Sequence, residues 1–332
     1  MRSTIIDSLT ERLLDEKWAI TIDEACELSA LGTEHLFDLL SLSRSVAAKH
    51  REKGVYLCSI ISAKTGACPE DCAFCAQSAH YPPSPRDAHP MLEPTSVLEA
   101  ARVAEKSGAT EFCIVTGGRG PDKGTMGKVL DAVRLIRAHT GLSVGCSLGI
   151  LTEEQAELLS TAGVNRYNHN LEASRTFFPN VCTTHGYDDR VRTARLVKEK
   201  GMELCCGGIL GLGESVRQRV ELAFELRKLN PSLVPLNFLN PRPNTPFAER
   251  PPLSPLEALR WVALFRVILP ESVLICAGGR EAVFGELQPL ALLAGANAVI
   301  AGNYLTTRGQ RASEDLDMIR SLGLPILSHS AQ

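Results

Sequence analysis

The alternation of short apolar runs with amphipathic segments is the feature that most constrains the fold of this chain. From Val55 onward, eight runs predict strands at Tyr56–Ser62, Glu111–Thr116, Leu142–Leu148, Asn165–Asn168, Glu203–Ile209, Leu233–Asn237, Ser272–Ala277 and Ala298–Ala301. Seven segments between them predict helices at Ser96–Ser107, Lys123–His139, Thr152–Thr161, Asp188–Lys200, Ser215–Leu229, Pro255–Leu269 and Glu286–Ala294. This order is typical of an α/β fold, a closed (β/α)8 barrel of the TIM type. A doubly wound open sheet is the alternative, because periodicity does not show closure.

The two ends of the chain differ from this pattern. Residues 1–54 carry apolar positions at helical spacing and predict an N-terminal helical extension. We expect the barrel to span residues 55–325 and a short C-terminal tail to span 326–332. The net charge of −3 offers no electrostatic footprint for nucleic acid. We expect a cytoplasmic protein without a membrane segment, because no signal pattern occurs and no run approaches the ~20 apolar residues of a membrane span.

Three cysteines stand close together after the first predicted strand. Cys68, Cys72 and Cys75 form a C-x3-C-x2-C spacing, in a loop where barrels place their active sites. Three thiols in one loop can hold a [4Fe–4S] cluster and leave one iron open to a small molecule. Zinc or a disulfide is the alternative, but zinc usually takes two paired units and no second unit follows.

Five further cysteines fall on predicted strands that would line one barrel: Cys113, Cys146, Cys205, Cys206 and Cys276. Free cysteine often packs like a small apolar residue, and this remains an alternative for each of them. Because side chains alternate along a strand, only one of Cys205 and Cys206 can face the barrel axis. The remaining cysteines, Cys26, Cys58 and Cys182, show no such pattern, and we expect them to be structural.

From about Val55 to Leu324 the chain resembles the biotin synthases, a family of radical S-adenosylmethionine (SAM) enzymes. The matching stretches are TGACPEDC at 65–72, YNHNLE at 167–172, CGGILGLGE at 206–214, PLNFL at 235–239, GGRE at 278–281 and AGAN at 294–297. The resemblance implies a radical SAM barrel that inserts sulfur between C6 and C9 of dethiobiotin. It also implies a [4Fe–4S] cluster on Cys68, Cys72 and Cys75 that binds and cleaves SAM, a low-potential electron donor such as flavodoxin or ferredoxin, and a homodimer.

The same resemblance implies which residues hold the small molecules. The residues expected at the cofactor are Phe74, Thr116, Gly117, Gly118, Asn170, Glu172, Arg190 and Ile209. Glu172 would accept hydrogen bonds from the ribose hydroxyls, and Arg190 would lie near the SAM carboxylate. The residues expected at the substrate are Asn168, Asn170 and Asn237, since amide side chains suit a neutral cyclic urea. His169 is expected to be structural.

One departure from the family pattern concerns a second cluster. Biotin synthases hold an auxiliary [2Fe–2S] cluster, the sulfur donor, on three cysteines and an arginine. Cys113 and Cys205 match two of these positions. The third cysteine falls on Gly145, beside Cys146, and the arginine falls on Ile275, beside Cys276. Our hypothesis is an auxiliary cluster, [4Fe–4S]-like or [2Fe–2S], whose ligands are all cysteines drawn from Cys113, Cys146, Cys205 or Cys206, and Cys276.

Two other functions remain open at this point. A related radical SAM enzyme of the same barrel branch could act on a different small molecule, and binding of dethiobiotin would discriminate. A non-enzymatic metal or redox protein would not cleave SAM.

Overall fold

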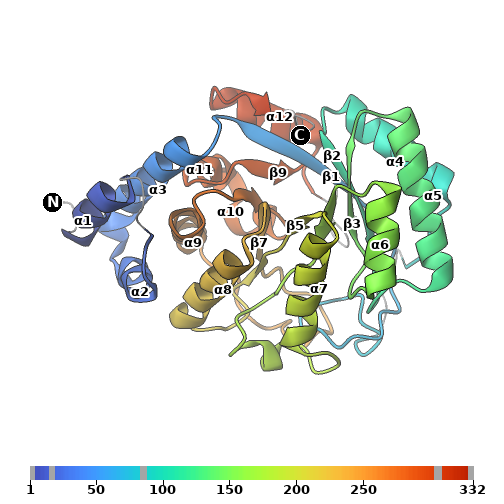
Figure 1. Ribbon diagram of the computed structural model, residues 1–332. Helices are drawn as coiled ribbons and strands as arrows, with labels where there is room; N and C mark the ends of the chain where they lie inside the picture. The colour runs from blue at the N-terminus through green and yellow to red at the C-terminus, as the bar shows by residue number, and fades with distance from the viewer. Residues whose placement is uncertain (1–3, 15–18, 83–87, 303–308, 328–332) are drawn as a thin grey trace.

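Parallel strands close into a barrel whose outer face is covered by helices (Figure 1). The computed structural model describes residues 4–14, 19–82, 88–302 and 309–327. The strands run in the order β10-β1-β2-β3-β4-β5-β7-β8-β9, with β6 paired to β7, and β1 also pairs with β9. They are β1 (Val55–Lys64), β2 (Glu111–Thr116), β3 (Ser143–Ser147), β4 (Arg166–Asn168), β5 (Glu203–Cys205), β6 (Gly208–Leu210), β7 (Leu233–Phe238), β8 (Val273–Cys276), β9 (Ala298–Ile300) and β10 (Ile326–Leu327). The β1–β9 pairing confirms the predicted closed barrel and excludes the open sheet.

The predicted fifth strand is interrupted into β5 and β6. Opposite the break lies Pro235 of β7, which has no backbone N–H to donate to a ladder. The chain also passes very close to β7, because a Cβ atom on Gly207 would lie 2.0 Å from the Pro235 carbonyl oxygen. Glycine is therefore required at this crossing, and the two half-strands pair with β7 on either side of it.

Most of the predicted helices occur within a residue or two of their predicted bounds. The observed ones are α4 (Pro94–Lys106), α5 (Lys123–His139), α6 (Glu153–Ala162), α7 (Tyr187–Glu199), α8 (Val216–Leu229) and α9 (Pro255–Ile268). The seventh predicted helix is a 3-10 turn, η3 (Gly285–Leu287), followed by α11 (Gln288–Leu293). The sequence pattern did not predict the short helices α10 (Arg280–Phe284) and α12 (Ala312–Ser321), or the 3-10 turn η2 (Phe178–Asn180).

The N-terminal segment is helical and packs outside the barrel. It comprises α1 (Thr4–Leu13), α2 (Ile22–Ala30), η1 (Thr33–His35) and α3 (Leu36–His50). In Figure 1 these helices lie beside α8 and α9, on the left of the view. Ser43 of α3 donates to the Ala294 carbonyl at 2.7 Å, which ties the segment to the end of α11.

The C-terminal part returns to the start of the barrel. Ile326 and Leu327 of β10 pair in parallel with Val55 and Tyr56 of β1, so the first two residues of the expected tail belong to the sheet. Residues 328–332 of that tail lie outside the described residues. Among helices of the described ranges, none is long and apolar enough to cross a membrane.

Candidate active site

The cysteine loop follows β1 and folds back on itself. Cys68 donates its backbone N–H to the Gln77 carbonyl, and the Ala79 N–H donates to the Cys68 carbonyl at 2.8 Å. The Cys75 N–H donates to the Cys72 carbonyl at 2.9 Å. In this fold of the loop, all three cysteines line one cavity of about 200 Å³, which we call the loop cavity.

The spacing of the three thiols suits a cluster better than a single ion. Four thiolates around one zinc ion, each at about 2.3 Å, lie about 4 Å from one another. Among the described residues, the only group of three or more His, Cys, Asp or Glu ligand atoms within 4.8 Å of one another is Glu70, Cys182 and His185. The thiols of Cys68, Cys72 and Cys75 therefore do not all lie as close together as the ligands of one zinc ion do. Burial raises the pKa of Cys75 to about 11, so a bound metal must stabilise its thiolate.

The SAM residues expected at the end of β2 and just after it line the same cavity. Thr116, Gly117 and Gly118 all line the loop cavity. A Cβ atom on Gly117 would lie 2.4 Å from the Gln77 Oε1 atom, and Gly118 has a φ of 153°. Glycine thus lets the backbone of residue 117 pack closely against Gln77, and the expected contact of residues 116–118 with a cofactor stays a prediction.

Glu172 is held in a strained backbone conformation at the wall of the cavity. Its φ is 66°, in the left-handed region that residues other than glycine rarely adopt. The Ile209 N–H donates to the Glu172 carbonyl at 2.8 Å, and a Cβ atom on Gly208 would lie 2.8 Å from the same oxygen. Burial raises the pKa of the Glu172 carboxyl, and Arg190, whose Nη1 lies 3.5 Å from Oε1, opposes that rise. Such over-determined strain is typical of functional sites.

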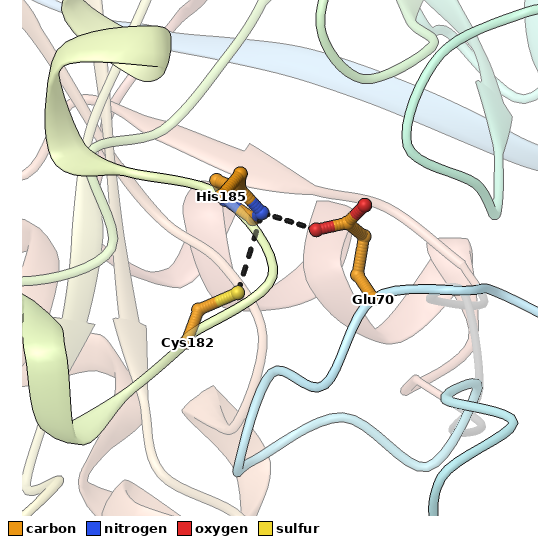
Figure 2. Close-up of side chains that lie close together, drawn as sticks. All are labelled: Glu70, Cys182 and His185. Carbon is orange, nitrogen blue, oxygen red and sulfur yellow. Dashed lines mark hydrogen bonds and ion pairs between the residues drawn. The ribbon is translucent and has the colours of Figure 1, made fainter.

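A hydrogen-bonded relay connects the cysteine loop to Arg190, and Figure 2 shows three of its members, Glu70, Cys182 and His185. Arg190 donates from Nε to His185 Nε2 at 3.0 Å, so the proton of the His185 ring lies on Nδ1. His185 Nδ1 in turn contacts the Glu70 carboxylate and lies 3.2 Å from Cys182 Sγ. Since both ring nitrogens are engaged, we interpret Glu70, Cys182 and His185 as a positioning group and not as a metal site. Arg190 also donates from Nη1 to the Asn170 carbonyl at 2.9 Å, which fixes its guanidinium at the loop cavity.

A second cavity of about 330 Å³ occupies the inside of the barrel, and we call it the barrel cavity. Its size is at the lower end of the range for small-molecule sites. The two cavities adjoin, because Phe74, Asn168, Asn170 and Glu172 line both. Side chains at these four positions would therefore face a molecule in either cavity.

The expected substrate amides lie on the wall of the barrel cavity. Asn168 Oδ1 is buried without a hydrogen-bond partner among the described residues. Asn237 is partly engaged, since its Nδ2 donates to the Gly208 carbonyl at 3.1 Å and its Oδ1 accepts from the Gly278 N–H at 3.0 Å. Ile209, expected at the cofactor, lines the barrel cavity as well.

The structure does not bring the five expected auxiliary cysteines together. Cys113 and Cys205 line the barrel cavity. The other three pack among apolar side chains behind the sheet, in the core shared with the helices: Cys146, Cys206 and Cys276. The pleat explains this, because their neighbours Gly145 and Ile275 take the inward positions. A thiol behind the sheet cannot reach the cavity, so the expected all-cysteine ligand set is not assembled.

Sequence reasoning assigned structural roles to two residues that line the cavities. Cys58 of β1 lies on the barrel cavity wall, and alternation along β1 was the only signal that could have placed it there. His169 lines the loop cavity, with a buried Nε2 that has no hydrogen-bond partner among the described residues. Its position between Asn168 and Asn170, both expected at the substrate, was the available signal.

Comparison with known proteins identifies the class of enzyme and then the family. The description "Radical SAM superfamily" matches residues 63–226, which contain the cysteine loop and the residues around it. The barrel, the three-thiol loop and this match define a radical SAM enzyme. The description "Biotin and Thiamin Synthesis associated domain" matches residues 235–325.

Two relatives and one solved structure complete the comparison. The biotin synthase of Frankia alni is 50% identical over 93% of this chain and 88% of its own length. That of Rhodococcus jostii is 47% identical over 98% and 96%. The chain belongs to the biotin synthase family. The structure of methylornithine synthase superposes with a TM-score of 0.83 over 98% of this chain and 97% of its own, at 19% identity, and this likeness concerns the fold alone.

Proposed function

We propose that this protein is a biotin synthase that inserts sulfur between C6 and C9 of dethiobiotin. Family membership over nearly the whole chain supports this activity. The observation that carries the proposal is the junction of the two cavities, because a radical formed on one side must meet the substrate directly. Cys68, Cys72 and Cys75 would hold a [4Fe–4S] cluster, which would supply the electron for cleavage of SAM to methionine and a 5′-deoxyadenosyl radical.

The chain's own residues would hold SAM in the loop cavity. Arg190, fixed by His185 and the Asn170 carbonyl, would bind the SAM carboxylate. Backbone groups at Thr116–Gly118 would contact the methionine part. The Glu172 carboxylate would accept hydrogen bonds from the ribose hydroxyls, a role that its burial and fixed backbone favour. These contacts would direct the adenosyl end towards the shared wall of the two cavities.

Dethiobiotin would occupy the barrel cavity. The unpartnered Oδ1 of Asn168 would accept an N–H of the ureido ring, and Asn237 would use its remaining hydrogen-bonding capacity there. Asn170, on the wall of both cavities, would contact both molecules. An auxiliary iron–sulfur cluster deeper in the barrel would supply the sulfur. We further propose a cytoplasmic homodimer that is reduced by flavodoxin or ferredoxin.

The test is product formation by anaerobically reconstituted protein. With dethiobiotin, SAM and a low-potential reductant, we expect biotin together with two molecules of 5′-deoxyadenosine per biotin, since two C–H bonds must break. Mass spectrometry measures both products. The matched control carries Cys68→Ala, Cys72→Ala and Cys75→Ala and should form neither.

Other outcomes would point to the alternatives. Production of 5′-deoxyadenosine without biotin, and without binding of dethiobiotin, would favour a related radical SAM enzyme acting on another small molecule. Absence of SAM cleavage by protein that holds its cluster would favour a non-enzymatic redox protein.

A further inference from the structure

We infer that Cys58, Cys113 and Cys205 are the protein ligands of the auxiliary iron–sulfur cluster in this chain. The three thiols come from β1, β2 and β5, and each side chain points to the barrel cavity. Their residues are 5%, 7% and 6% exposed, so each thiol is available only from inside the barrel. No other cysteine lines the wall of this cavity among the described residues.

The family's familiar ligand set does not fit this cavity. Gly145 and Ile275, at the positions of the third cysteine and the arginine, both face inward and offer no donor atom. Cys58 supplies the missing thiol from another strand. It packs in one group of buried side chains with Cys205 and Ile275 at the inner face of the barrel. The ligand position has therefore moved to β1, and the neighbouring Cys146 and Cys276 have not replaced it.

Gly145 places no side chain beside the Cys113 thiol. A Cβ atom on Gly145 would lie 3.4 Å from the Cys113 Sγ atom, so a side chain at 145 would occupy the volume next to this sulfur. Glycine leaves that volume open. Among the described residues, the three thiols also do not all lie within 4.8 Å of one another, which disfavours a single ion held by all three.

A buried arginine lies on the wall of the same cavity. Arg166 of β4 lines the barrel cavity with a side chain only 7% exposed. Its guanidinium pairs with Glu111 and Glu203, which fix its position. The cavity that the three thiols line therefore also has a buried, paired guanidinium on its wall.

This ligand set rests on the proposed function, because the family supplies the expectation of an auxiliary cluster. The test measures bound cluster and not biotin, so the two can fail separately. If the parent enzyme forms biotin while a Cys58 variant keeps its barrel cluster, the ligand assignment fails and the function stands. If the parent forms no biotin while the Cys58 variant loses the cluster, the assignment stands and the function fails.

The experiment uses the Cys68→Ala, Cys72→Ala, Cys75→Ala protein as background, so that all remaining iron reports on the barrel. We expect this background to retain iron, sulfide and a cluster spectrum after anaerobic reconstitution. Adding Cys58→Ala or the closer isostere Cys58→Ser should lower iron affinity by at least about 10- to 100-fold. That is the loss typical when a residue that only hydrogen-bonds to a metal ligand is removed. Iron and sulfide analysis and electron paramagnetic resonance provide the readouts.

Matched controls come from the thiols behind the sheet. Cys146→Ala and Cys276→Ala in the same background should keep the iron, since these side chains pack away from the cavity. Circular dichroism melts establish that each variant is folded. Iron retained by both folded Cys58 variants, iron lost on changing Cys276, or a background without iron would each overturn the assignment.

Discussion

Glu172→Gln should change two quantities that can be measured separately, the stability of the fold and the affinity for SAM. Burial raises the Glu172 pKa from its ordinary value of 4.5, so the folded state holds the proton more tightly than the unfolded chain. Ionisation therefore costs folding free energy as the pH rises from 4.5 through the raised pKa. Glutamine has the same shape and never ionises. The variant should be more stable than the parent at pH 8 and should lose this advantage near pH 4.

The same substitution should weaken SAM binding. A carboxylate can accept a hydrogen bond from each ribose hydroxyl, whereas the amide of glutamine offers one acceptor and one donor. Loss of one hydrogen bond to a charged group costs about 1.5–3 kcal/mol, equivalent to a roughly 10- to 150-fold weaker Kd. Anaerobic titration calorimetry with SAM measures the affinity, and thermal melts across pH measure the stability.

Glu154→Gln is the matched control, because Glu154 is an exposed carboxylate in the first turn of α6. It should leave SAM affinity unchanged. Our reasoning about Glu172 would be refuted by a variant that binds SAM as tightly as the parent, or by one that is less stable at neutral pH. Either result would make Glu172 a structural residue of the β4–α7 connection.

Two further predictions concern the scaffold. Arg266 of α9 is fully buried and donates to five oxygens, including Asn297 Oδ1. Arg266→Met should therefore lower the free energy of unfolding by about 3 kcal/mol or more, which denaturant titration measures. An unchanged midpoint of the titration would contradict this. Gly207→Ala should disrupt the β6–β7 crossing through the clash with Pro235, whereas Gly127→Ala on α5, with nothing within 4 Å, should stabilise by about 0.5–1 kcal/mol. Comparable melting temperatures for the two alanine variants would show that the crossing can relax.

Local features of the chain gave most of the fold and the cofactor side of the site. Strand and helix periods predicted the order of the barrel elements, because each period is set within a few residues. The cysteine loop was predictable for the same reason, since Cys68, Cys72 and Cys75 lie close together in the sequence, in the loop after β1. The break between β5 and β6 was not predictable, because it depends on Pro235 of a strand distant in sequence.

By itself, the sequence determined the alternating barrel, the three-thiol loop and the family to which the chain belongs. Only the tertiary structure decided which cysteines share the barrel cavity. Alternation along a strand is local, but the face that points to the axis is set by pairing with neighbours, as in the register of Cys113 with Gly145. A shift of one residue turns a thiol from the cavity to the helix layer. Cys58 therefore faces the cavity while Cys146 and Cys276 face away, because barrel closure fixes the inward face of every strand at once.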